Sequence, residues 1–248
     1  MNIHAATQLL LDARNSGVVL DWRRLPVGDA ATAYAVQDAQ ILRLGPVGGW
    51  KVGSRGDGSE PSCAPLPASC VLASGVQLAG PQWRLRGLEV ELALRVGRDY
   101  HPGDALPGRD ELLGVFDAVM PAIEVVETRL GKLPCDNPWA AMADLQSHGA
   151  LVVGPALPMP AVAPELDGIV ASLAIDGKEV AHEAGGNPAA LWPTLAWLAH
   201  HCARRGMPLK KGQIVTTGSC TGLHSARGGR LVEAALQGMG AVSLRFAG

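Results

Sequence analysis

The chain has 248 residues, of which 48% are hydrophobic and 18% charged, and this composition excludes a disordered chain and a coiled coil. Its 31 glycines and 18 prolines favour many short elements joined by tight turns over a helical bundle. The net charge of −2 provides no basic excess that would indicate a nucleic-acid partner.

The cysteines and the lengths of the apolar runs indicate in which cellular compartment the protein is expected. The cysteines are scattered, odd in number and without a Cys-x-x-Cys pair, which argues against a disulfide scaffold or a zinc ribbon and fits a reducing cytoplasm. Residues 1–15 lack the basic start and apolar run of a secretory signal. No stretch approaches the ~18 apolar residues that a membrane span requires. We therefore expect a cytoplasmic protein with no membrane partner.

The N-terminal residues 1–48 have a helical pattern. Ala5 to Ala13 predicts one amphipathic helix, and a second is expected to start at Asp29, a good N-cap, and to end at Gly45-Pro46. Gly, Pro and Ser then cluster from Gly53 to Ala68, which predicts a long loop.

Period-two alternation dominates from residue 70 onward. Leu88 to Val96 predicts a long strand that ends at Gly97, and Asp176-Gly177 predicts a hairpin between strands 169–175 and 179–182. Asn187-Pro188 is expected to begin a helix that closes at Arg204 to Gly206. Further strands are expected at 120–126, 151–153, 214–217, 231–236 and 241–246. The predicted fold is α+β, with a helical appendage over 1–48 and a strand-rich body over 49–248.

Two glutamates lie two residues apart on the strand at 88–96. Glu89 and Glu91 leave the same face with Cα atoms ~6.6 Å apart, so their carboxylates can converge on one hard divalent cation. A solvent-facing strand edge explains a lone Glu-x-Glu equally well and is the commoner case.

A third carboxylate, Glu124, stands in the middle of the apolar strand at 120–126. Such a group is costly unless it is paired, protonated or bound to a metal, and Glu127 and Arg129 are candidates for its solvated, ion-paired neighbours. Three oxygen ligands with open positions suit Mg²⁺ or Mn²⁺. No His or Cys stands beside them at ligand spacing, which disfavours zinc.

Two further segments carry polar groups in apolar surroundings. Lys51 is either a snorkelling surface lysine or a desolvated ammonium that holds a substrate carboxylate or moves a proton. The run from Thr216 to Ser219 follows an apolar strand, so its hydroxyls and backbone N–H groups suit an anion cradle, although an ordinary turn explains the tetrapeptide as well.

In order along the chain, these segments resemble the 2-keto-4-pentenoate hydratase family of the fumarylacetoacetate hydrolase-like superfamily. The pieces that carry the resemblance span nearly the whole chain. They are Ala35–Gln37, Gly49–Gly53, Leu88–Glu91, Ala122–Val126, Ala143-Asp144 with Ser147 and Gly149, Gly186–Pro188, and Lys211–Ser219.

This resemblance implies a β-roll body, a homo-oligomer and a 2-oxo acid substrate that chelates a Mg²⁺ or Mn²⁺ ion. The implied metal ligands are Glu89, Glu91 and Glu124. Implied catalytic residues are Lys51, Glu60 and Asp144, and implied substrate contacts are Ser147, Thr217, Gly218 and Ser219. A divalent cation stabilises the enolate of such a substrate, which can then accept water at C4.

The sequence departs from the family pattern at two places. Hydratases usually carry a Pro-Asp-aromatic-Gly stretch in the loop after the lysine. This chain has Glu60-Pro61-Ser62-Cys63-Ala64-Pro65-Leu66 there, with no such aspartate, so either Glu60 replaces it or the acid is missing. Leu145 follows Asp144 where the family commonly has Asn. A decarboxylase of 2-oxo-3-enedioates needs the loop acid less, so it remains an alternative to the hydratase.

Two other activities are weighed against these lyases. A C–C hydrolase of the superfamily needs a water-activating base, and His148 or His182 would have to serve, although an ordinary polar role near strand ends is favoured for both. A non-catalytic paralogue, or a subunit in a mixed oligomer with a pathway partner enzyme, has no physical need for a buried Glu124.

Overall fold

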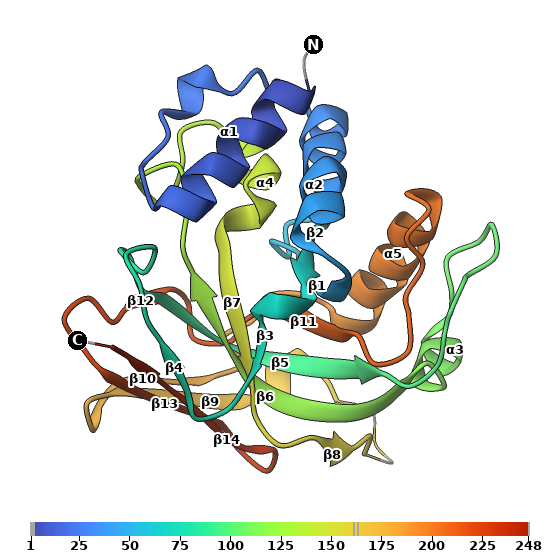
Figure 1. Cartoon of the computed structure of the whole chain (residues 1–248). Coiled ribbons are helices and arrows are strands. Elements are labelled where there is room, and N and C mark those ends of the chain that lie inside the picture. The colour runs from blue at the N-terminus through green and yellow to red at the C-terminus, as the bar shows by residue number, and fades with distance from the viewer. Residues whose placement is uncertain (1–2, 161, 163, 248) are drawn as a thin grey trace.

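The computed structural model describes residues 3–160, 162 and 164–247, and its N-terminal part is a helical layer (Figure 1). Helix α1 covers Ile3–Ser16 and helix α2 covers Ala30–Leu44, joined by a 3₁₀ turn at Trp22–Arg24. The Asp29 side chain accepts a hydrogen bond from the Thr32 N–H and Gly45 ends the helix at φ 110°, so both predicted ends of α2 are confirmed. Helix α4, Pro138–Ala143, joins this layer from much later in the chain.

A large mixed sheet forms the centre of the molecule. Among the described residues it has nine strands, in the order β2-β1-β11-β5-β6-β7-β3, with β12 added to β5 and β8 to β6. The strands are β1 Val47–Gly53, β2 Ser62–Pro67, β3 Val71–Ala73, β5 Gly87–Val96, β6 Phe116–Val126, β7 His148–Val153, β8 Leu157–Pro158, β11 Ile214–Ser219 and β12 His224–Ser225.

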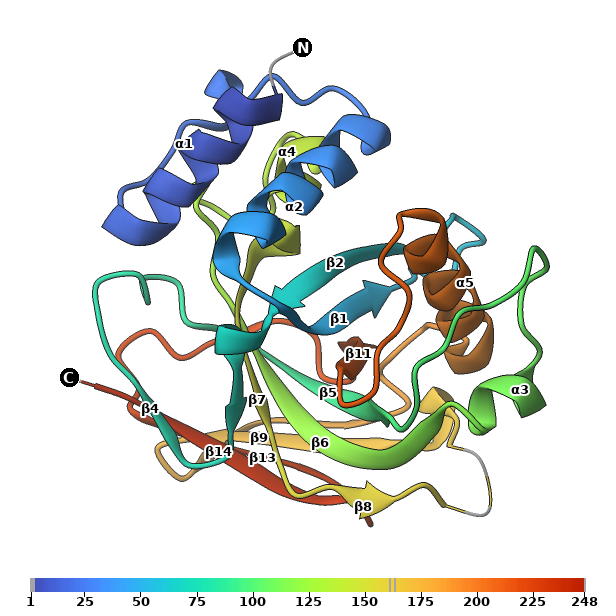
Figure 2. The ribbon, with the colours of Figure 1, turned by 45° about the vertical axis from the view of Figure 1, so that its right-hand side comes forward.

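A second sheet packs against one face of the first (Figure 2). In the described chain it has five strands in the order β10-β9-β13-β14-β4. They are β4 Val76–Leu78, β9 Val170–Ile175, β10 Lys178–Ala184, β13 Leu231–Leu236 and β14 Gly240–Phe246. The hairpin at Asp176-Gly177 is confirmed, with both residues at positive φ.

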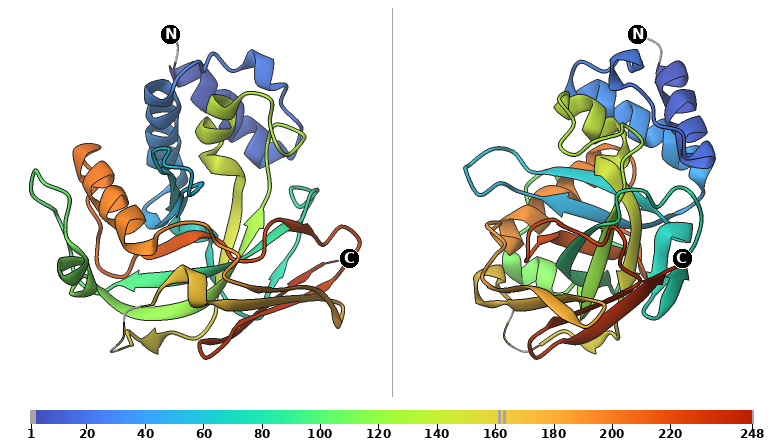
Figure 3. Two further views of the ribbon diagram at one scale, coloured as in Figure 1. Left: turned by 180° about the vertical axis from the view of Figure 1, so that it is seen from behind. Right: turned by 90° about the vertical axis from the view of Figure 1, so that its left-hand side faces the viewer.

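Alternation along β5 and β6 gives the large sheet two different faces. Leu88, Val90 and Leu92 point into the main core against the second sheet, which the alternating pattern predicts. Ala93 and Met120 lie on the opposite face in a separate apolar cluster. That opposite face is the one turned toward the helical layer (Figure 3).

Helix α5, Leu191–Arg204, packs beside β1 and β11, and the short helix α3, Arg109–Leu113, packs on α5. The predicted α+β class is confirmed. In the described part of the chain, no helix combines the length and apolar character needed to cross a membrane.

Two local predictions were wrong. The segment 53–68 is a loop only as far as Pro61, because residues 62–67 form β2 and pair with β1. Helix α5 begins at Leu191, and Asn187 is not its N-cap. The Asn187 amide instead donates to the backbone oxygens of Thr217 and Gly218, at 3.0 and 2.8 Å. Its Oδ1 accepts from the Ala189 N–H at 2.9 Å, so Asn187 forms a turn that precedes the helix and joins that turn to β11.

Candidate metal and 2-oxo acid site

Three carboxylates meet on the face of the large sheet that is turned away from the second sheet. Glu89 on β5 lies directly opposite Glu124 on β6, and Glu91 follows two residues along on the same face. One oxygen from each of the three carboxylates lies within 4.8 Å of the other two. Since β5 runs between β11 and β6, the alternative of a solvent-facing sheet edge is wrong.

Burial and mutual repulsion shift the ionisation of these carboxyl groups. Glu91 and Glu124 are each 1% exposed. Burial first, and then the charges of Glu124 and Glu89, raise the pKa of Glu91 well above its usual range. Burial also opposes ionisation of Glu124, but Lys51 and His148 outweigh it and bring its pKa to about 2. Glu91 and Glu89, whose pKa is also raised by burial and by Glu124, therefore resist ionisation until a further cation is present, whereas Glu124 is ionised.

Lys51 places a positively charged side chain beside the three carboxylates. Its Nζ donates to Glu124 Oε1 at 2.7 Å and to the Gln146 backbone oxygen at 3.1 Å, and its side chain is 14% exposed. A snorkelling surface lysine is therefore excluded. Burial lowers its pKa, but Glu124, Glu89 and Glu91 together reverse that effect, so the net pKa is raised.

A left-handed turn brings the Gln146 carbonyl to Lys51. Leu145, Gln146 and Ser147 have φ values of 49°, 53° and 60°, and each such non-glycine residue costs roughly 1–3 kcal/mol. The Leu145 side chain is fully buried, and Gln146 Nε2 donates to Ser62 Oγ at 2.7 Å. Strain held in place beside a buried lysine is typical of a functional turn.

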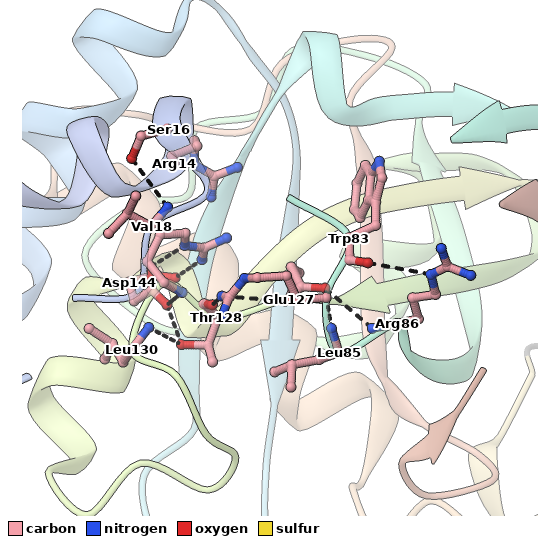
Figure 4. A network of polar contacts seen from close by, with 12 residues as sticks. Arg14, Ser16, Val18, Trp83, Leu85, Arg86, Glu127, Thr128, Leu130 and Asp144 are labelled. Carbon is pink, nitrogen blue, oxygen red and sulfur yellow. Dashed lines mark hydrogen bonds and ion pairs between the residues drawn. The ribbon is translucent and has the colours of Figure 1, made fainter. Parts of the chain in front are cut away.

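Asp144 anchors the start of this turn. Its Oδ2 accepts from Thr128 Oγ1 at 2.7 Å and from the Arg129 N–H at 3.0 Å, while Oδ1 pairs with Arg129 Nε (Figure 4). Both carboxylate oxygens are thus engaged within the network. These contacts favour a positioning role for Asp144, and its predicted catalytic role stays a prediction.

The prediction that Glu127 and Arg129 are solvated partners of Glu124 was wrong. Both are buried, Arg129 pairs with Asp144, and Glu127 Oε2 accepts from the N–H groups of Leu85 and Arg86 (Figure 4). Both residues follow the end of β6 at Val126, so their side chains contact other groups than Glu124.

Breaking the Asp144–Arg129 pair is expected to destabilise the fold strongly. Asp144→Asn leaves a buried guanidinium without its counter-charge, so we expect the free energy of unfolding to fall by about 3–5 kcal/mol. The exposed pair Arg95–Asp117 is the matched control, and Asp117→Asn is expected to cost under about 1 kcal/mol. Urea denaturation of the two variants measures both values, and equal losses would contradict the anchoring role.

The three predicted substrate contacts on β11 have internal partners. Thr217 Oγ1 donates to the Leu92 oxygen at 3.0 Å, the Gly218 N–H donates to Glu91 Oε2 at 2.8 Å, and Ser219 Oγ donates to the Gly222 oxygen at 3.1 Å. Ser147, buried and next to Gln146, is the fourth predicted contact. Gly218 thus joins the carboxylate cluster directly, and substrate contact by any of the four stays a prediction.

Thr216 is the first residue of the possible anion cradle, but it is not one of the substrate contacts that the family resemblance implies. It pairs across the sheet with Lys51 on one side and with Ala93 on the other. Its Oγ1 is buried without a hydrogen-bond partner among the described residues. The run Thr216–Ser219 could not single out this hydroxyl from its sequence. Only the pairing of β11 with β1 and β5 shows which face of the sheet the hydroxyl occupies.

Glu60 lies in the loop between β1 and β2, and its side chain bonds to α5. Its Oε1 accepts from Trp197 Nε1 at 3.0 Å, and the residue is exposed. Gly56 in the same loop approaches the Pro188 backbone. The structure therefore does not bring Glu60 into the carboxylate cluster, and its predicted catalytic role stays a prediction.

His148 is a site residue that the sequence argument placed among ordinary polar residues. It is fully buried at the start of β7, and its Nδ1 lies 3.1 Å from Glu124 Oε1. Glu124 Oε1 therefore contacts both Lys51 and His148, while Glu124 Oε2 is buried with no partner among the described residues. His182 is exposed and bonds to Glu179.

Acid is expected to destabilise the metal-free protein through His148. Burial lowers its pKa from 6.5 to about 4, so the unfolded chain binds the extra proton first. The His148 contribution to stability is full above about pH 6.5 and is lost as the pH falls toward about 4. Denaturation in a chelator should show this decline for the parent and a weaker one for His148→Asn. If the free energy of unfolding of His148→Asn fell with decreasing pH as steeply as that of the parent, His148 would not be the cause of the decline.

The cluster fits a hard divalent cation. It offers three carboxylates on one face, and the orphaned Glu124 Oε2 is a buried acceptor that a cation would satisfy. An all-oxygen donor set of this kind suits Mg²⁺ or Mn²⁺ and is a poor match for zinc.

Comparison with known proteins agrees with this geometry. Residues 48–247 match the family described as fumarylacetoacetate (FAA) hydrolase C-terminal. The chain is 28% identical to the TodF product hydratase of Pseudomonas putida F1, over 99% of this chain and 95% of that protein. It is 26% identical to 2-keto-4-pentenoate hydratase 1 of Dechloromonas aromatica, over 100% and 98% of the two chains.

Solved structures show the same fold. The 4-oxalocrotonate decarboxylase of Pseudomonas putida G7 superposes with a TM-score of 0.83 at 22% identity, covering 99% of this chain and 97% of that one. That structure is complexed with calcium and acetate, and a second structure of the same enzyme, at 21% identity and the same TM-score and coverage, with magnesium and adipate.

Proposed function

Because the chain belongs to the fumarylacetoacetate hydrolase C-terminal family, we propose that it is a Mg²⁺- or Mn²⁺-dependent lyase that adds water to an unsaturated 2-oxo acid. The proposal depends mainly on one observation: the carboxylates of Glu89, Glu91 and Glu124 converge beside the Lys51 ammonium, away from solvent. The hydratases related to this chain over nearly its whole length support the choice of reaction.

Glu89, Glu91 and Glu124 would hold the divalent cation in this proposal. When bound, the cation would supply Lewis-acid stabilisation of the enolate charge that develops on a 2-oxo acid. The structures of the decarboxylase with magnesium and of a fumarylpyruvate hydrolase with Mn²⁺ support the choice of cation.

Lys51 is the proposed proton carrier. Its ammonium is held in one place by Glu124 Oε1 and the Gln146 oxygen, so it has a third proton free to face a substrate. Hydration of 2-hydroxypenta-2,4-dienoate to 4-hydroxy-2-oxopentanoate adds a proton at C5, a hydroxyl at C4 and a proton at C3. The enol oxygen at C2 loses its proton, so the net addition is one water. The Thr216 hydroxyl, on the strand next to Lys51 and without a hydrogen-bond partner in the described part of the chain, is a further proposed donor toward the substrate.

A decarboxylase of 2-oxo-3-enedioates is the second candidate. Glu60 bonds to Trp197 and lies outside the carboxylate cluster, and a decarboxylase needs a loop acid less than a hydratase does. Loss of CO₂ leaves the same kind of dienolate, which a proton then quenches, so Glu89, Glu91, Glu124 and Lys51 would serve both reactions.

Two incubations with Mg²⁺ distinguish the candidates. We expect 2-hydroxypenta-2,4-dienoate to be converted to 4-hydroxy-2-oxopentanoate, and no CO₂ to be released from 2-oxohex-3-enedioate. The reverse result would assign the decarboxylase. Absence of both products, with Mg²⁺ and oxalate still bound, would overturn the lyase and leave the non-catalytic paralogue.

We also propose a homo-oligomer in the cytoplasm. Leu42 on α2 is 84% exposed and Val18 after α1 is 66% exposed, which supports burial of the helical layer against another copy. All five cysteines are free, which supports a reducing compartment. Light scattering of the purified protein tests the first of these proposals, and a monomer would contradict it.

A further inference from the structure

A cavity of about 420 Å³ lies outside the carboxylate cluster, between the end of α1 and the end of the large sheet. Its walls come from six separated parts of the chain: the end of α1, the end of α2, the stretch from Ser69 to Leu72, the segment Gln82–Arg84, the residues that follow β6 and the start of β7. Its volume falls in the range of small-molecule sites. The proposed lyase reaction makes no use of it.

The cavity wall carries more positive than negative side chains. Arg14, Arg84 and Arg129 line it together with the single carboxylate Glu127. Arg129 is neutralised by Asp144 behind the wall, and Arg84 NH2 lies 3.6 Å from Glu127 Oε1. Arg14 has neither kind of partner: within the described chain, its guanidinium hydrogen-bonds only the His148 backbone oxygen, at 3.0 Å.

Arg14 is therefore a cation with no carboxylate in ion-pair contact among the described residues, and Asp144 acts on it only through its charge at longer range. Arg129 donates to the same His148 oxygen at 2.8 Å, so two guanidinium groups meet at one carbonyl. Burial first, and then the charge of Arg129, lower the pKa of Arg14 to about 10. An anion beside Arg14 would offset both the burial of its charge and the repulsion from Arg129.

Apolar side chains form a large part of the rest of the wall, beside the polar residues Asn15, Ser69, Gln82 and Thr128. Trp83, Leu72, Leu44 and Ala150 line the cavity, and the Trp83 indole N–H is already bonded to the Ala79 oxygen, so the ring offers its face and edges to a ligand. Figure 4 draws Arg14 and Trp83 with Glu127 and Thr128 between them. We propose that this cavity binds a small carboxylate with an apolar body, anchored by its charge to Arg14.

Protection of a cysteine provides the test. Cys70 lines the cavity, whereas Cys135 is equally half-buried but packs under the helical layer. The full-length protein is treated with iodoacetamide, and alkylation of each cysteine is followed by mass spectrometry with increasing hexanoate. We expect hexanoate to slow alkylation of Cys70 but not of Cys135. Hexanamide, the neutral analogue of the same size, is expected to protect neither.

Matched variants identify the anchor. Arg14→Met is expected to raise the hexanoate concentration for half-protection by roughly tenfold or more, since a charged hydrogen bond is lost. Arg24→Met removes an exposed arginine of the same layer and should change nothing. Arg14→Lys keeps the charge and should keep most of the protection. If Arg14→Met does not fold, Arg14→Lys still tests the requirement for a positive charge.

Three outcomes would overturn the proposal: no protection of Cys70 by hexanoate, equal protection by hexanamide, or undiminished protection in folded Arg14→Met. The assay contains neither Mg²⁺ nor substrate, so its failure leaves the proposed lyase function untouched.

Discussion

Replacing Glu124 by Gln is expected to abolish both metal binding and turnover. The change keeps the shape of the side chain but removes a ligand charge and the counter-charge of Lys51. Groups that only support a metal ligand are worth 10–100-fold, so losing a ligand should weaken Mg²⁺ binding by more than roughly 100-fold. Calorimetric titration of Mg²⁺, with and without oxalate as a 2-oxo acid mimic, measures the loss.

Glu233→Gln is the control for this variant, because Glu233 is an exposed glutamate on β13 of the second sheet. It should bind Mg²⁺ and oxalate as the parent does. If Glu124→Gln also binds both like the parent, the carboxylate cluster does not hold the metal.

Lys51→Met is expected to destabilise the metal-free protein and to stop the reaction. Glu89, Glu91 and Glu124 would then face one another without a cation, and breaking such a buried pair costs about 3–5 kcal/mol. Mg²⁺ replaces the lost positive charge, so saturating Mg²⁺ should recover most of the stability but none of the proton transfer. Denaturation with chelator and with Mg²⁺, together with single-turnover assays, separates the two effects.

Lys132→Met is the matched control, because Lys132 pairs with Asp136 at the surface and should cost under about 1 kcal/mol. If chelated Lys51→Met is as stable as the chelated control, Lys51 does not balance the cluster. Full activity of Lys51→Met would remove the lysine from the chemistry.

The features that follow from local pattern were predictable from the sequence. Alternation from Leu88 to Val96 sets β5 and the shared face of Glu89 and Glu91, because the pleat repeats every two residues. Glu124 could be singled out because a carboxylate inside an apolar strand needs a partner. The Asp29 cap and the Asp176-Gly177 hairpin depend on backbone conformations that those residues favour.

The features that depend on register and tertiary contact could not be predicted. Whether Glu124 lies opposite Glu89 is decided by how β5 and β6 pair, which a single strand does not record. His148 looks like any polar residue at a strand end until β7 is placed beside β6. Asn187 has a good capping sequence, but its Oδ1 accepts from the Ala189 N–H in a turn before α5, and its NH2 group donates to two backbone oxygens of β11.

The central claim is that Glu89, Glu91 and Glu124 together hold one divalent cation that binds a 2-oxo acid. Anomalous diffraction from crystals grown with Mn²⁺ and oxalate tests it most directly. We predict one strong anomalous peak coordinated by the three carboxylates, with oxalate on its open side and Lys51 beside it. A peak elsewhere, or a Mn²⁺-free cluster in crystals that bind oxalate, would contradict the claim.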